Sequence, residues 1–192
     1  MLTRLIDALA RIMAILGGLV LAGLVVTTCL SIAGRFLNGV LHADPLAGTA
    51  FSEALLAFGI GPIDGDFELI EAGMAFAIFA FLPITQLTGA HAAVDVFTAR
   101  MGAGANRLLA LLWSTVFAGV LVLIAWQLWL GTAAKMRYGE TTYLIQFPIW
   151  WAYAASLAGA VVAALVAVHV AVLRAAELAT GQAILPADGD GR

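Results

Sequence analysis

Three carboxylates, Asp66, Glu68 and Glu71, stand directly before a long uncharged stretch, within "GDFELIEAGMAFAIFAFLP" at residues 65–83. Carboxylates at the start of a helix complement its exposed N–H groups and the positive end of its dipole. We therefore predict that Asp66 or Asp64 caps a helix here. This explains two of the acids. Glu71 lies one turn deeper, where a carboxylate is costly unless it has a partner.

Few other side chains have the types and spacing that catalysis or metal binding needs. The sequence has no Cys/His cluster with metal-ligand spacing, and no Ser-x-x-Lys, Gly-x-Ser-x-Gly or phosphate-loop pattern. The single cysteine, Cys29, has no second cysteine to pair with, and we expect it to be a small buried hydrophobe. The sequence therefore predicts no enzymatic activity and no metal or cofactor in this chain.

The histidines are a further candidate group, because two facing imidazoles can hold a haem. Only His169 lies inside an apolar stretch, and His42 and His91 fall on opposite sides of the membrane in the topology derived below. We therefore expect no bis-histidine haem. A membrane redox subunit that uses His169 is a separate hypothesis, which the visible absorbance spectrum of the purified protein tests.

The elements that position these residues follow from the composition. The 192 residues are 63% hydrophobic and 11% charged, with a mean hydropathy of +1.03, which is typical of a membrane protein. Backbone groups in lipid must be satisfied within their own segment, so spanning runs of about 20 residues form helices. The sequence predicts an all-α integral membrane protein with four transmembrane helices, near residues 12–34, 69–88, 108–130 and 149–173.

The distribution of Lys and Arg predicts the orientation. The N-terminus, the second loop and the C-terminal tail together carry six Lys or Arg residues, whereas the other side carries three. The positive-inside rule then places both termini in the cytoplasm. Trp and Tyr residues around the third loop, such as Trp129 and Tyr143, suit an aromatic belt at the outer interface.

Segments outside the spans have patterns of their own. Residues 2–11 suit a short interfacial helix on the inner leaflet. We assign this helix and the four spans to one membrane domain, residues 1–175. In the outer segment 44–63, Phe51, Leu55 and Phe58 follow helical spacing, which predicts a short amphipathic helix along the outer surface. Turn-forming residues in the cytoplasmic tail, 176–192, predict disorder.

Small residues recur at four-residue spacing in the spans and let helix backbones approach closely. On the fourth span this stripe consists of Ala155, Gly159, Ala163 and Ala167. Packing among the four helices of the chain accounts for most such stripes. The unusually wide arc of small residues on the fourth span also suggests a partner protein.

The polar residues between these spans form a recognisable set. The chain resembles the small permease subunit of tripartite ATP-independent periplasmic (TRAP) transporters over residues from about 25 to 175. The pieces that carry the resemblance are "SIAGRFLNG" with Arg35, "GDFELIEAG", "QLTGAHAAVDVFTAR", "RYGETT" and "FPIWWAY". The segment from about 41 to 63 is longer than expected for this family, which puts any assumed docking geometry for a binding protein in doubt.

The resemblance implies a division of labour. In this family a large elevator-type permease carries the substrate and the sodium ions, and a soluble periplasmic binding protein delivers carboxylates or sulfonates. The small subunit is a static scaffold in the bacterial inner membrane, with no substrate, sodium or cofactor site of its own. It packs against the large permease and helps to form the periplasmic docking face.

Several polar residues are candidates for contacts within the chain or with these partners. A charge-assisted contact between Arg35 and Glu71, or of either with the partner, would explain the excess acid. His91 and Asp95 are four residues apart and pair if a helix continues through them; a solvated loop is the alternative. For Tyr138 and Glu140 the alternatives are a turn contact, which the adjacent glycine favours, and docking of the binding protein.

A second function from another class is a small homo-oligomeric channel or exporter. Such a protein needs a polar pore, and its best candidates are Thr27, Ser31, Gln127 and His169. Altered ion selectivity in alanine variants at these positions would favour the channel over the scaffold.

Overall fold

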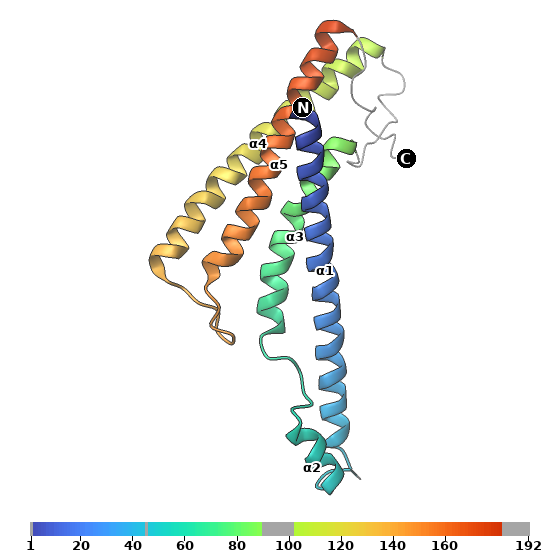
Figure 1. Ribbon diagram of the computed structural model, residues 1–192, viewed down its shortest axis with the longest axis vertical. Helices are drawn as coiled ribbons and strands as arrows, with labels where there is room; N and C mark the ends of the chain where they lie inside the picture. Colours follow the sequence, from blue (N-terminus) through green and yellow to red (C-terminus); the bar gives the residue numbers. More distant parts are fainter. Residues whose placement is uncertain (1, 45, 90–101, 182–192) are drawn as a thin grey trace.

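The computed structural model describes residues 2–44, 46–89 and 102–181, which form five α-helices (Figure 1). Their bounds are α1 Leu2–Leu41, α2 Ala50–Ala57, α3 Asp66–Thr88, α4 Ala103–Tyr138 and α5 Ile149–Thr180. All but α2 are long and apolar enough to cross a membrane, and each contains one of the four predicted spans. The predicted all-α membrane fold with four spans is confirmed.

Helix α1 is longer than predicted at both ends. It runs for 40 residues, which corresponds to about 60 Å of helix. Residues 2–11, predicted as a separate interfacial helix, are instead its first turns. No proline or glycine precedes Gly17, so nothing in the sequence interrupts the helix there. Ile6 and Ala10 in these turns are buried against Val166 and Val170 of α5.

Helix α5 also extends past its predicted end. Residues 176–180, predicted to belong to a disordered tail, continue the helix, because this stretch is rich in helix-forming Ala, Leu and Glu. The helix ends at Gly181, whose φ of 72° is the left-handed conformation that glycine adopts readily. Residues 182–192, the rest of the predicted tail, lie outside the described residues.

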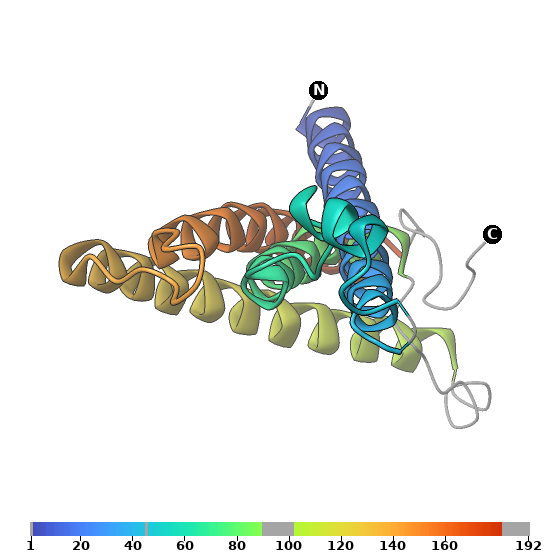
Figure 2. The same ribbon diagram turned by 90° about the horizontal axis from the view of Figure 1, so that it is seen from below.

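The spanning helices follow one another in the packing order α1, α3, α5, α4. Helix α3 lies between α1 and α5, while α4 packs mainly on α5 (Figures 1 and 2). Two clusters of buried apolar residues hold this arrangement. One joins α4 to α5 through Ala118, Leu121, Ala163, Ala164 and Ala167, and the other joins the start of α1 to α5.

Helix α2 lies beyond the start of α3, along the continuation of α1 (Figure 1). We call this end of the molecule the α2 end, and the end with the start of α1 and the close of α5 the terminal end. Thr49 caps α2, because its hydroxyl oxygen accepts a hydrogen bond from the Ser52 N–H at 3.2 Å. Helix α2 is the short helix predicted in segment 44–63.

Candidate functional site

Polar side chains at the α2 end join α1 to the start of α3. The Ser31 hydroxyl donates to Asp66 Oδ2 at 2.6 Å, and both side chains are buried. The Ser31 oxygen also accepts the Ile63 N–H at 3.3 Å, so it joins the incoming segment to the same point. Arg35 Nη2 lies 3.9 Å from Asp66 Oδ2 and completes a cluster of one cation, one anion and one hydroxyl.

The partner of Arg35 is therefore Asp66, and the predicted contact between Arg35 and Glu71 is not formed. Glu71 is exposed and has no ion-pair or hydrogen-bond partner within the described part of the chain. The reason is the rotation of α3 about its axis. Asp66 and Glu71 are five residues apart, or about 500° of helix, so they point in different directions.

The prediction that Asp66 or Asp64 is the N-cap of this helix is wrong. Gly65 is the N-cap of α3 with a φ of 77°, and it makes no side-chain capping bond. Asp66 is the first helical residue, and its Oδ1 accepts the N–H of Phe67 at 2.8 Å. A side chain at position 65 is excluded twice, by the positive φ and by Ile145, whose Cγ1 would lie 2.2 Å from a Cβ.

Glu68 ties α3 to the connection between α4 and α5. Its two carboxylate oxygens accept the backbone N–H groups of Leu144, at 2.7 Å, and Ile145, at 3.0 Å. Hydrogen bonds from backbone N–H groups to a carboxylate are among the stronger hydrogen bonds in proteins. Sequence reasoning assigned this acid only to the helix dipole, because the partners are backbone groups more than 70 residues away.

The α4–α5 connection is a narrow turn with its own ion pair. Helix α4 ends at Gly139 in the left-handed conformation, and Lys135 Nζ lies 2.5 Å from Glu140 Oε2. Backbone bonds from the Ile149 N–H to the Glu140 carbonyl (3.1 Å) and from the Thr142 N–H to the Phe147 carbonyl (2.9 Å) close the turn. Glu140 thus makes a turn contact, whereas Tyr138 is exposed and takes no part in it.

The small residues of α5 are used within the chain. Gly159, Ala163 and Ala167 are buried, whereas Ala155 is exposed. At Gly159 the backbones of α5 and α3 touch, since a Cβ there would lie 2.9 Å from the Phe79 Cβ and 3.1 Å from its carbonyl carbon. Gly159 faces α3, while Ala163 and Ala167 pack against α4, so the arc of small residues no longer argues for a partner protein.

The polar residues inside the spans mostly bond to their own helix. The hydroxyls of Thr27 and Thr28 donate to the carbonyls of Gly23 and Leu24, at 2.9 and 2.8 Å, and Thr115 bonds to Leu111 in the same way. Ser31, a candidate pore residue, is buried and bonded to Asp66. Gln127 is exposed, and the interhelical hydrogen bond expected for a buried glutamine is not formed within the described residues.

A hollow of about 220 Å³ lies between α1 and α3. Its walls are Leu21, Leu24, Val25, Thr28, Cys29, Ile70 and Met74. The Thr28 hydroxyl is already bonded to its own helix, so the hollow offers almost only apolar surface. Cys29 is exposed here, so the prediction that it is a small buried residue is wrong.

At the terminal end, sequence reasoning missed a buried ion pair on α5. Arg174 Nη1 lies 3.0 Å from Glu177 Oε2, and the side chains are only 11% and 4% exposed. The i, i+3 spacing of opposite charges was the available signal. It was not used, because Glu177 was assigned to a disordered tail.

Two further buried polar atoms on α5, Ser156 Oγ and His169 Nε2, have no hydrogen-bond partner in the part of the chain that the structure describes. Over the same residues no group of three His, Cys, Asp or Glu side chains could hold a metal ion. The predicted pair His91 and Asp95 lies outside the described residues.

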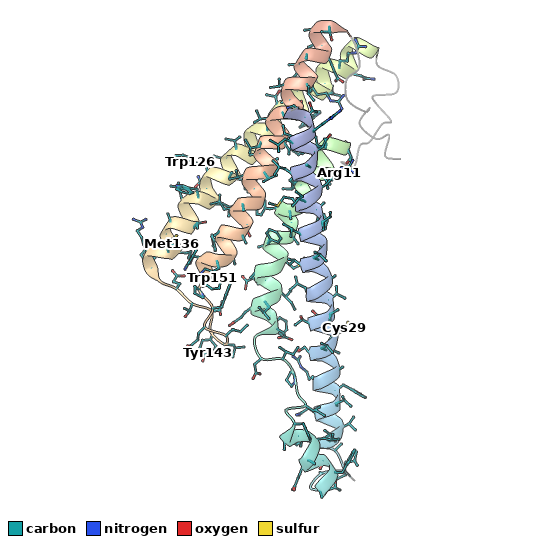
Figure 3. All side chains as sticks on the ribbon, in the orientation of Figure 1. Arg11, Cys29, Trp126, Met136, Tyr143 and Trp151 are labelled. Atoms are coloured by element: carbon teal, nitrogen blue, oxygen red, sulfur yellow. The ribbon has the colours of Figure 1, made fainter. Side chains whose placement is uncertain are left out.

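Polar contacts join helices at the α2 end, and an ion pair within α5 lies at the terminal end. Ser31, Asp66 and Glu68 join α1, α3 and the α4–α5 turn, and the Arg174–Glu177 pair lies at the other end of α5. Large apolar side chains cover the outside of α1 and α4, for example Trp126 on α4, while Tyr143 lies at the tip of the turn (Figure 3).

Comparison with known proteins agrees with this geometry. The family model described as "Tripartite ATP-independent periplasmic transporters, DctQ component" matches residues 24–178, which is more than half of the chain and includes Ser31, Asp66, Glu68 and the Arg174–Glu177 pair. No curated protein and no solved structure matches the sequence. The matched region begins within α1 at residue 24, covers the whole of α2, α3 and α4, and ends two residues before the close of α5. The chain belongs to the DctQ family, the small permease subunits of TRAP transporters.

Proposed function

We propose that this subunit is the static scaffold of a sodium-driven, binding-protein-dependent transporter that takes up organic acids, either carboxylates or sulfonates. In this proposal it lies in the bacterial inner membrane with both termini in the cytoplasm. It packs against a large elevator-type permease and contributes to the periplasmic face on which the binding protein docks. The sodium ions and the substrate are held by the large subunit.

One observation carries this proposal: most hydroxyl and carboxylate groups described in the spans are bonded within the chain. Ser31 and Asp66 bond to each other, Glu68 binds two backbone N–H groups, and the threonines bond to their own helices. A transport site needs polar groups that are directed at a solute near the middle of the membrane. This distribution supports a scaffold rather than a carrier, and it removes Ser31 from the pore that a channel would need.

The apolar exterior supports a large partner. In the most apolar 18-residue windows of α1 and α4, only 11% of the residues are buried within the chain, against 50% for α5. Helix α5 is thus the helix most buried within the chain, whereas α1, α4 and also α3, at 17%, leave most of their surface exposed. Lipid covers part of this surface, and we assign the remainder to the large permease.

Reconstitution tests the proposal. The chain alone, and the chain co-purified with its large permease, are placed in separate liposomes with an inward sodium gradient. Binding protein and a panel of radiolabelled carboxylates and sulfonates are added outside. We expect sodium-dependent uptake only with the two-subunit complex, and only when binding protein is present. Uptake by the chain alone would refute the scaffold and favour the channel or exporter.

A further inference from the structure

The end of α1 and the whole of α2 form a projection, which we call the arm and define as residues 36–44 and 46–58. Arg35 is level with Asp66, the first residue of α3, because their side chains are 3.9 Å apart. Helix α1 continues for six residues past this level, which adds about 9 Å of helix. Helix α2 follows it in the chain. Figure 1 shows the arm extending past both the start of α3 and the α4–α5 turn.

Contacts between α1 and the segment that follows α2 hold the arm in place. The Asn38 side-chain amide donates to the Ile60 carbonyl at 3.1 Å, which joins α1 to the segment that returns from α2. Gly34 touches the backbone of Gly61, leaving no room there for a Cβ. Within the arm, Leu41 and Ser52 are buried. A surface held in this way loses little conformational entropy when it binds a partner.

The outer surface of the arm is aromatic. Phe51 and Phe58 are 64% and 88% exposed, and their separation of seven residues places them on one side of α2. Phe36 on α1 is also exposed. Large aromatic side chains in such exposed positions mark surfaces that another molecule covers.

The charge of the arm indicates which molecule that is. Asp44 and Glu53 are exposed, and the sequence has no Lys or Arg between Arg35 and Arg100. Helices that lie on a bilayer surface usually carry Lys and Arg on their polar side, because bacterial lipids include anionic headgroups. An acidic, aromatic projection is repelled by such a surface and complements a protein with a basic patch.

We propose that the arm is a docking surface for the soluble substrate-binding protein, which would present basic side chains to Asp44 and Glu53 and apolar pockets to Phe51 and Phe58. This inference rests on the proposed function, including the orientation that places the arm in the periplasm. It assigns a role to the segment that is longer than expected for the family.

The test measures binding of the transporter's own binding protein to the two-subunit complex in nanodiscs of neutral lipid. We expect the Phe51→Ser/Phe58→Ser double variant to weaken binding about tenfold or more, as the loss of central aromatic contacts does. Asp44→Lys/Glu53→Lys should also weaken binding and flatten its dependence on salt concentration. Leu178→Ser is the control, since this apolar residue is 38% exposed on α5 at the terminal end, which the proposed orientation places on the opposite side of the membrane. Its affinity should stay within about twofold of the wild type.

A second measurement tests the alternative that the arm lies on the lipid bilayer. The Phe58→Trp substitution, in a chain whose five native Trp residues are replaced by Phe, reports contact with brominated lipid through fluorescence quenching. We expect no quenching. Strong quenching would assign the arm to the bilayer and overturn the proposal, as would unchanged binding in both arm variants. If uptake by the complex is independent of binding protein, the proposed function fails first. If uptake depends on it and the arm variants bind normally, only the arm proposal fails.

Discussion

The Ser31 hydroxyl lies 2.6 Å from Asp66 Oδ2, across an interval of 35 residues in the sequence. This hydrogen bond fixes α1 against the first turn of α3 at the same level as Arg35. Ser31 is 1% and Asp66 8% exposed, so water has little access to replace either partner.

Removing this hydroxyl should destabilise the fold. We expect Ser31→Ala to lower the free energy of unfolding by about 1–3 kcal/mol, because it leaves a buried carboxylate without one of its donors. The measurement is reversible unfolding in mixed detergent micelles, followed by tryptophan fluorescence. Thr27→Ala is the matched control, since its hydroxyl bonds only to its own helix, and it should cost less than about 0.5 kcal/mol. Equal effects of the two changes would show that the Ser31–Asp66 bond has no special weight.

Arg35 should be coupled to Asp66 and not to Glu71. The guanidinium side chain is 60% exposed and its contact with Asp66 is long, so a double-mutant cycle should give a coupling free energy of about 0–1 kcal/mol. The cycle between Arg35 and Glu71 should give none, because Glu71 points elsewhere on α3. A larger coupling to Glu71 in the complete transporter would mean that a partner subunit brings the two together.

Glu68 should control the rigidity of the α4–α5 turn. We expect Glu68→Gln to speed hydrogen exchange at the Leu144 and Ile145 amides, because the neutral amide group accepts backbone hydrogen bonds less strongly than the carboxylate. Hydrogen–deuterium exchange with mass spectrometry measures this. Glu71→Gln removes a charge one turn away without touching the turn, so exchange there should match the wild type. Similar exchange in the two variants would refute the role given to Glu68.

Gly159 should be hard to replace, because it lies where α5 and α3 are in close contact. We expect Gly159→Ala to cost about 1–3 kcal/mol, because the new methyl group meets the backbone of α3, which cannot rotate away as a side chain can. Gly119→Ala on α4 is the matched control, since a Cβ there meets nothing within 4 Å. That change should be neutral or slightly stabilising in the same unfolding assay. A neutral Gly159→Ala would indicate that α3 and α5 can separate freely.

Breaking the buried Arg174–Glu177 pair should be more harmful than breaking the exposed one. We expect Glu177→Ala to destabilise the chain by about 1–3 kcal/mol, because it removes a buried carboxylate that accepts a hydrogen bond from Arg174. Glu140→Ala removes the partner of Lys135 in a pair that is partly exposed to solvent, and its effect should be much smaller. Comparable losses from both changes would contradict the difference in burial.

Much of the fold could be predicted from hydropathy, because the bilayer forces every apolar run of sufficient length into a helix. The ends of the helices were less predictable. The helix-forming residues at 176–180 and the amphipathic pattern of residues 2–11 are compatible with a continuing helix but do not require one. Their burial decides the matter, as Ile6 and Glu177 show, and burial depends on where the other helices lie.

The polar contacts were harder to predict than the spans. The importance of Arg35 and the acids near residue 66 follows from the cost of charge beside an apolar run. Their pairing depends on the rotation of each helix about its axis, which hydropathy does not define. Glu68 binds backbone groups, which leave no trace in the residue types of the turn.

The packing order of the helices has a consequence for biosynthesis. Helices α1 and α3 leave the ribosome before α4 and α5, and each of these pairs is in contact, so two hairpins can assemble from neighbouring segments at low cost in loop closure. The contact of Ile6 and Ala10 with Val166 and Val170 is formed only after the last hairpin has emerged. We therefore expect a nascent chain stalled before residue 160 to keep the start of α1 uncovered, available to insertion chaperones and quality-control proteases until α5 arrives.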